Sequence, residues 1–102
     1  MNLKEKLEGY KKNNTILLLS GKILTNSSFG KVDKVGDDYI VFRQVIHEEE
    51  IGWLMDVKYK YSGTTVLTIP FTSLIFTVHP RMEWAQEKFK EAESNDYKRK
   101  VR

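Results

Sequence analysis

The sequence predicts a mainly β fold: a small, five-stranded, strongly bent antiparallel barrel with a short N-terminal helix and a C-terminal amphipathic helix. Two observations indicate this class. Between Thr15 and Val78 the chain is a series of short β-type runs, each with a glycine or another turn residue at its edge. No helical pattern of useful length separates these runs, which excludes a βαβ crossover architecture. With 102 residues, the chain is close to the usual size for one domain.

The first expected element is a helix that ends at Asn13–Asn14. Leu3, Leu7 and Tyr10 recur at helical spacing and form one apolar stripe, and Asn2 is a suitable N-cap. A helix of about three turns is marginal alone, so we expect its stripe to cover an open end of the barrel.

Alternation and turn residues then predict the strands. Gly30 lies where a strand must curve, as a glycine at a bend or bulge does. The charged run His47–Glu50 indicates a connection, Ser62–Gly63 a turn, and Pro70 the end of a strand before the single turn Phe71–Ser73. The expected strands are Ile16–Leu19 (buried on both sides), Lys22–Val35 (a strand pair or one bent strand), Tyr39–Ile46, Trp53–Tyr61, Thr64–Ile69 and Leu74–Val78. The alternation at Trp53–Tyr61 predicts an extended hairpin from the third and fourth strands.

After Pro80 we expect an amphipathic helix that packs on the barrel or on a neighbouring subunit. Its apolar residues share one helical face: Met82, Ala85, Phe89 and Ala92. The predicted organisation is therefore a barrel with its N-terminal helix in residues 1–80, a C-terminal helix in 81–95, and a basic, disordered tail in 96–102.

Composition limits the function classes. The net charge of +3 is concentrated at the two ends, because residues 1–12 sum to +2, residues 94–102 to +3, and the rest to −2. The chain has no cysteine, which excludes disulfides and thiolate chemistry. No apolar run approaches the roughly 20 residues of a membrane span. We expect a cytoplasmic protein without a membrane association.

Three segments carry a family resemblance: Thr15–Gly21, Gly30–Phe42 and Ile69–Val78. With the helix before them, and the one-turn link before the last strand, they resemble the Sm-like family in its Hfq-type form, over about Leu3–Val78. The resemblance implies an Sm-like barrel and a homo-oligomeric ring of five to seven subunits that binds single-stranded RNA. The uncharged fourth and fifth strands suit such a ring, because the fourth strand of one copy can pair with the fifth of the next.

The candidate nucleic-acid-binding residues follow from that resemblance. Tyr39 and Phe71 lie beside loops that face the pore of an Sm-like ring, where an aromatic ring can stack on a base. The family's RNA-binding pair in the last turn falls on Phe71 and Thr72. Lys31 and Lys34 flank the first loop and can contact phosphate. Both rings can instead pack in the core, and both lysines can be ordinary surface residues.

A second function class stays open, a structural or protein-assembly ring without RNA binding. The slightly acidic body favours it, as does Asp38 at the position of a pore-loop residue of the family. We expect no enzyme, cofactor or metal site. His47 and His79 have no ligand-spaced partners, and consecutive acidic residues at Glu48–Glu50 alternate sides.

Overall fold

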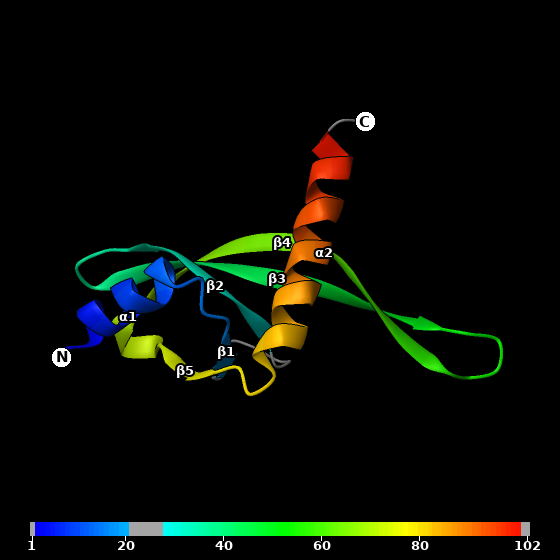
Figure 1. Cartoon of the computed structure of the whole chain (residues 1–102), viewed down its shortest axis with the longest axis horizontal. Coiled ribbons are helices and arrows are strands. Elements are labelled where there is room, and N and C mark those ends of the chain that lie inside the picture. Colours follow the sequence, from blue (N-terminus) through cyan, green and yellow to red (C-terminus); the bar gives the residue numbers. More distant parts are fainter. Residues whose placement is uncertain (1, 21–27, 101–102) are drawn as a thin grey trace.

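The computed structural model describes residues 2–20 and 28–100, so the first part of the strand expected from Lys22 lies outside the described residues. Five antiparallel strands form one sheet, with a helix at each end of the chain (Figure 1). The elements are α1 (Leu3–Lys12), β1 (Leu17–Ser20), β2 (Ser28–Val35), β3 (Tyr39–Ile51), β4 (Val57–Pro70), the 3₁₀ turn η1 (Phe71–Ser73), β5 (Ile75–Val78) and α2 (Met82–Lys100).

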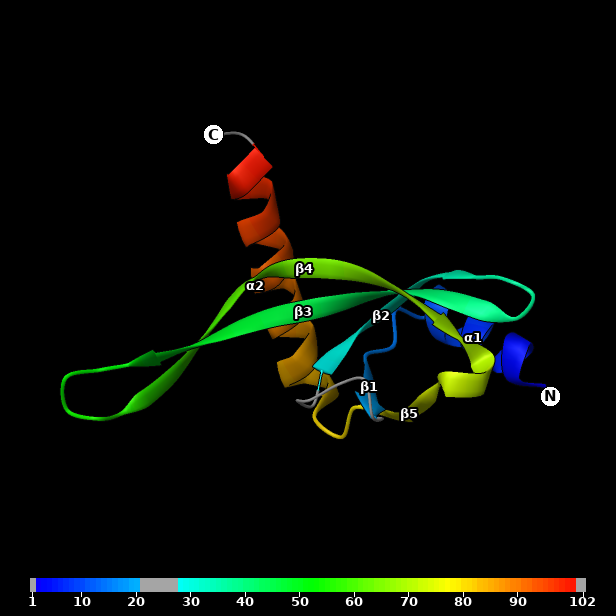
Figure 2. The same ribbon diagram turned by 180° about the vertical axis from the view of Figure 1, so that it is seen from behind.

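The mainly β class, the antiparallel sheet and the two helices confirm the expectation, but the sheet is not closed. Its strand order is β4-β3-β2-β1-β5. Strands β4 and β5 therefore form opposite edges, and within residues 2–20 and 28–100 they do not pair with each other. The single molecule is an open, twisted sheet (Figure 2).

Helix α1 forms as its sequence predicts. The Asn2 side chain accepts the N–H of Glu5 at 2.8 Å, and Asn13 and Asn14 end the helix, Asn14 in the left-handed region with φ 54°. Leu7 of this helix is fully buried against the sheet, and its packing fixes the position of α1.

Two apolar cores lie on opposite faces of the sheet, because neighbouring residues of β1 point to opposite sides. Leu17 and Leu19 join the α1 core, together with Leu7, Val32, Ile40 and Phe42. Ile16 joins the α2 core, together with Phe29, Val45, Tyr61, Ala85, Phe89 and Ala92. The expectation that Ile16–Leu19 is covered on both sides is therefore confirmed, as is the apolar face of α2.

The structure has the extended β3–β4 hairpin that the sequence predicts, but the strands and the turn have other bounds. The charged run His47–Glu50 is not a connection, since it continues β3 to Ile51. The strand expected over Trp53–Tyr61 begins only at Val57, because Gly52–Asp56 forms the turn. Ser62 and Gly63 lie inside β4, at the register shift opposite Ile46 and His47. The hairpin thus projects as one long ribbon beyond α2 (Figure 1).

Helix α2 continues to Lys100, which corrects the expectation of a disordered tail from Asp96. Three polar side chains of its last turns bind the backbone of β4. Asn95 donates to the carbonyl of Tyr61 at 2.7 Å, Arg99 donates to that of Ser62 at 2.8 Å, and the Asp96 carboxylate accepts the N–H of Thr64 at 3.0 Å. We call Asn95, Asp96 and Arg99 the α2 clip. It orders the helix end and covers β4 from Tyr61 to Thr64.

Candidate functional site

The turn before Tyr39 and the turn Phe71–Ser73, which carry most of the candidate RNA-binding residues, meet at one end of the sheet. Phe71 at the start of η1 donates its backbone N–H to the carbonyl of Asp38, at 2.9 Å, in the turn between β2 and β3. Tyr39, the first residue of β3, lies opposite Pro70, the last residue of β4. Tyr39 therefore lies next to Phe71 and Thr72, although the two segments are distant in the sequence. We call this the turn site.

The ring of Tyr39 folds back over Gly36. A Cβ at residue 36 would overlap this ring, so only glycine leaves room for it. The turn is closed by a hydrogen bond from the N–H of Gly36 to the carbonyl of Tyr39, at 2.8 Å.

A basic depression adjoins the turn site. Lys34 lies with its Nζ 5.9 Å from the centroid of the Tyr39 ring, at the limit of a cation–π contact. It also lines a depression of about 330 Å³ with Glu8, Lys11, Lys12 and Val35. Three lysines against one glutamate leave this depression positive, which suits a phosphate group.

One acidic group of the turn is partly neutralised. Lys4 donates to Asp37 at 2.9 Å, and this hydrogen bond and its charge lower the pKa of the Asp37 carboxyl and raise the pKa of Lys4. Both side chains are exposed, so the pair matters for the local charge rather than for stability.

The five predicted site residues separate into two groups. Lys34, Tyr39, Phe71 and Thr72 belong to the turn site, where Thr72 is exposed and Phe71 is half-buried against the α1 core. Lys31 lies elsewhere, with its Nζ 4.6 Å from the centroid of the Phe89 ring on α2. The reason is strand alternation, because Lys31 is two residues from Phe29 and lies on the same face of β2, the face toward α2.

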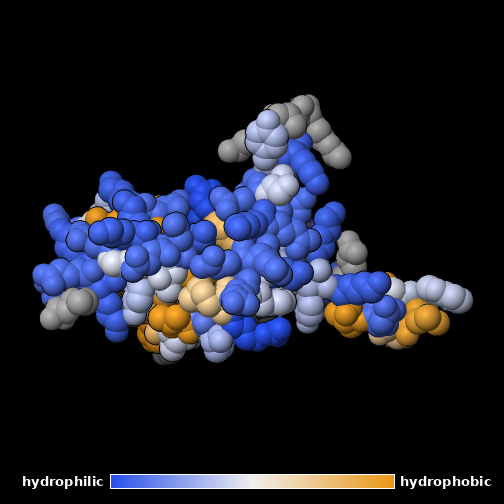
Figure 3. Space-filling view, viewed as in Figure 1, coloured by the Kyte–Doolittle hydropathy of each residue, from blue (hydrophilic) through white to orange (hydrophobic). Residues whose placement is uncertain are grey.

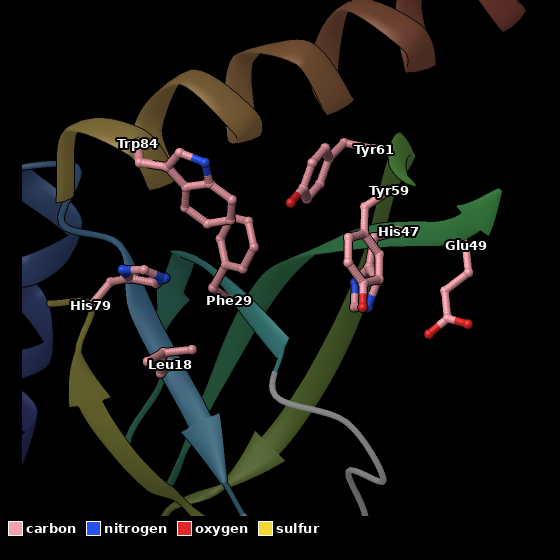
Figure 4. A pocket seen from close by; sticks show the side chains of 8 residues that line it. All are labelled: Leu18, Phe29, His47, Glu49, Tyr59, Tyr61, His79 and Trp84. Atoms are coloured by element: carbon pink, nitrogen blue, oxygen red, sulfur yellow. The ribbon is translucent and has the colours of Figure 1, made fainter. Parts of the chain in front are cut away.

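Sequence reasoning missed a second candidate site, which we call the aromatic pocket. It is a cavity of about 320 Å³ between β1, β2, the hairpin and the start of α2 (Figure 4). It is lined mostly by rings: Leu18, Phe29, His47, Glu49, Tyr59, Tyr61, His79 and Trp84. Only the unpredicted continuation of β3 brings His47 and Glu49 to it, so no short sequence pattern could have found it.

His79 is the buried polar group of this pocket. Its Nδ1 accepts the backbone N–H of Arg81 at 3.0 Å, and its ring lies edge-on to Phe29 with 5.4 Å between centroids. Burial lowers the pKa of His79, and the charge of Arg81 lowers it further, so the imidazole is neutral near pH 7. Within the described part of the chain, no three His, Asp or Glu side chains are grouped as a metal site.

Comparison with protein-family models, curated proteins and solved structures found no match for this chain. No helix in the described ranges is long and apolar enough to cross a membrane. The two candidate sites and the edges of the sheet are therefore the features of this chain that bear on its function.

Proposed function

We propose that this protein is an Sm-like RNA-binding protein that forms a homo-oligomeric ring of five to seven subunits and binds single-stranded RNA at the turn site. The observation that carries the proposal is the hydrogen bond between Asp38 and Phe71. It holds two aromatic side chains, Tyr39 and Phe71, beside the positive depression at Lys34. Aromatic rings next to cations are the usual arrangement for unpaired bases and their phosphates.

The edges of the sheet support the ring. The α2 clip covers β4 only from Tyr61 to Thr64, so the edge of Thr65–Ile69 is not covered by the clip. These five residues carry no charged side chain that would oppose pairing with another strand. Strand β5 at the other edge, Ile75–Val78, is also uncharged, and Ile75 is 59% exposed. Two different edges that pair head to tail produce a ring when the rotation closes.

Light scattering tests the ring. We expect a mass five to seven times that of the 12.0 kDa chain. Val66→Lys should give a smaller species, since a lysine on an edge strand opposes pairing, and Lys90→Ala, on the exposed surface of α2, should leave the mass unchanged. A wild-type monomer at micromolar concentration would contradict this part of the proposal.

Titration with oligo-U and oligo-A tests the base contacts. Phe71→Leu keeps an apolar side chain against the α1 core but removes the ring face, so loss of stacking should cost roughly 1–3 kcal/mol of binding free energy. Tyr39→Leu is the second ring variant. Melting curves show whether each variant is folded, and unchanged affinity in both folded variants would contradict stacking at this site.

The second function class is a protein-assembly module without RNA binding. A specific observation favours it: the hairpin turn exposes Trp53, Leu54 and Met55, three adjacent apolar side chains. Such a group suits contact with a protein rather than with a polyanion. An absence of RNA binding at low salt, together with a ring of the expected mass, is the result that this class predicts.

A further inference from the structure

The aromatic pocket is an arc of rings around one open space of about 320 Å³. Trp84 and Phe29 form one end of the arc, with 5.7 Å between their centroids, and His47 and Tyr59 form the other end at the same distance. Tyr61 joins the two ends, because its ring lies 6.0 Å from that of Trp84 and 6.4 Å from that of His47. Figure 4 shows the two ends on opposite sides of the space. A small group inside the pocket therefore meets aromatic rings on more than one side.

Glu49 adds one negative charge to the lining of the pocket. Strand alternation places the preceding residue, Glu48, on the other face of the ribbon, where it lies opposite Lys60. Glu49 instead lies opposite Tyr59, so its cross-strand neighbour is a ring and not a cation. The imidazole of His79, which is neutral near pH 7, does not offset this charge. The pocket therefore combines electron-rich rings with a carboxylate, and both attract a cation.

Two cations of the chain already lie on rings of the arc. The guanidinium carbon of Arg81 is 5.1 Å from the centroid of the Trp84 ring, and Lys88 Nζ is 5.3 Å from that of the Tyr61 ring. Neither Arg81 nor Lys88 lines the pocket. Lys88 is also 3.7 Å from Glu91, which offsets part of its charge. The interior of the pocket is therefore open to a cation from outside the chain.

The chemistry of the walls favours an alkylated ammonium over a primary one. A primary ammonium carries three N–H donors, which need acceptors once they leave water. A quaternary ammonium carries no N–H, and its methyl groups pack against ring faces while its charge is attracted by them. The volume of about 320 Å³ is at the lower end of the range for small-molecule sites, about 300–1,000 Å³, which fits such a compact group.

The hairpin of the same chain leaves the pocket open. Figure 3 shows its apolar tip as a hydrophobic patch at the end of the projecting arm, and Trp53 of this tip is 92% exposed. Tyr59, on the wall of the pocket, is 53% exposed, so this side can be reached from solvent. The turn site lies at the other end of the sheet, beside α1 (Figure 1). A ligand in the pocket therefore does not compete with RNA at the turn site.

We propose that the aromatic pocket binds a quaternary ammonium group, which sits among the rings of Tyr59, Tyr61 and Trp84 and is balanced by the carboxylate of Glu49. The group belongs either to a free small molecule such as choline or to a trimethylated lysine of a peptide, since both present the same chemistry. This binding is separate from the RNA contacts of the turn site and from ring formation.

Proton NMR with choline tests the site. Aromatic rings around the bound group should move the N-methyl signal of choline upfield, and the dependence of this shift on protein concentration gives the affinity. The matched control is the neutral analogue in which a tert-butyl group replaces the trimethylammonium. It should bind at least about tenfold more weakly, because it has the same shape without the charge. Equal affinities for the two compounds would overturn the proposal.

A peptide pair distinguishes the two sources of the group. One peptide carries a trimethylated lysine and the other carries the same lysine unmodified. Tighter binding of the trimethylated peptide than of choline assigns the pocket to a peptide, and equal affinities assign it to a small molecule. The proposal fails if neither choline nor the trimethylated peptide binds at millimolar concentration, or if the unmodified peptide binds as well as the trimethylated one.

Two variants locate the binding in the pocket. Glu49→Gln removes the charge of an exposed side chain, so it should fold and should weaken choline binding about two- to fivefold. Its control is Glu48→Gln, on the other face of the same strand, which should change nothing. Tyr59→Leu removes a ring and should weaken choline binding about threefold or more, whereas Tyr97→Leu, at an exposed position of α2 outside the pocket, should not.

The same variants separate this proposal from RNA binding. Glu49→Gln and Tyr59→Leu should bind oligo-U as the wild type does, because both residues are far from the turn site. Wild-type affinity for choline in both variants would overturn the assignment of the pocket, whatever the result with oligo-U.

Discussion

Replacing Asp96 with alanine tests whether α2 is held on the sheet by its polar clip as well as by its apolar face. The carboxylate accepts the backbone N–H of Thr64 at 3.0 Å and the hydroxyl of the same residue. It also pairs with Arg99 at 3.2 Å. Alanine is the best helix former, so any loss of stability cannot come from helix propensity.

The expected loss is about 2–3 kcal/mol of unfolding free energy. A hydrogen bond to a charged acceptor contributes about 1.5–3 kcal/mol, and Asp96 accepts two from Thr64. The side chain is 23% exposed, so water compensates part of the loss. The ion pair with the half-exposed Arg99 adds about 0–1 kcal/mol.

Urea and thermal unfolding followed by circular dichroism measure this change. For a domain of this size we expect a fall of roughly 10–20 °C in melting temperature. The neighbouring Ser94→Ala, at an exposed position of the same helix, is the control and should change stability by less than about 0.5 kcal/mol. If Asp96→Ala were as stable as Ser94→Ala, the clip would be incidental and our account of the helix end would be wrong.

The same group predicts a pH dependence. Burial alone would raise the pKa of Asp96, but the hydrogen bonds from Thr64 and the charges of Arg99 and Arg43 lower it below the ordinary value of 3.8. The unfolded chain then binds the proton first as the pH falls. The stability advantage of the wild type over Asp96→Asn should therefore be complete above pH 3.8 and should decrease below it.

Three further changes test other parts of the fold. Gly30→Ala should destabilise by about 1–3 kcal/mol or more, because its Cβ would overlap the carbonyl oxygen of Arg43 and lie 3.0 Å from the Cα of Gln44; a neutral result would contradict this close approach. Leu7→Ala should cost about 2–5 kcal/mol, since the side chain is fully buried under the sheet, whereas Leu3→Ala at an exposed position should cost much less; equal losses would refute the assignment of the buried face. The lowered pKa of His79 predicts that wild-type stability falls as the pH drops below 6.5, and His79→Gln should lack this slope; equal slopes would show that the imidazole is not held neutral.

The parts of the fold that depend on local pattern could be predicted from the sequence. The apolar run of β1 and the apolar face of α2 are buried as their periodicity indicates. In the stripe of α1, Leu7 is buried and Tyr10 packs against the same core, whereas Leu3 stays exposed.

The bounds of the hairpin could not be predicted in this way. Its outer part, beyond the contact with α2, is exposed, so Glu48 can pair across the ribbon with Lys60 without any apolar alternation. The alternation of Trp53 and Met55 with their neighbours predicted a strand, although both residues lie in the exposed turn.

The candidate site was predicted in part. Tyr39, Phe71 and Thr72 follow from the two turns, and the turns meet because β3 pairs with β4 up to Pro70. The position of Lys31 depends on which face of β2 it occupies, which a resemblance at the level of segments does not fix. The aromatic pocket depends on the length of β3 and on the packing of α2, both long-range features of the fold.

Fluorescence anisotropy of labelled oligo-U with wild type, Lys34→Ala and Lys31→Ala at two salt concentrations tests whether the turn site binds RNA. Lys34 borders the turn site, whereas Lys31 is a lysine of the same strand that lies over Phe89. We expect wild-type binding to weaken steeply with salt, by about 0.7 logarithmic units per decade for each phosphate neutralised. Lys34→Ala should weaken binding and reduce the salt slope, while Lys31→Ala should change neither. No binding at low salt, or equal effects of the two substitutions, would contradict RNA binding at the turn site.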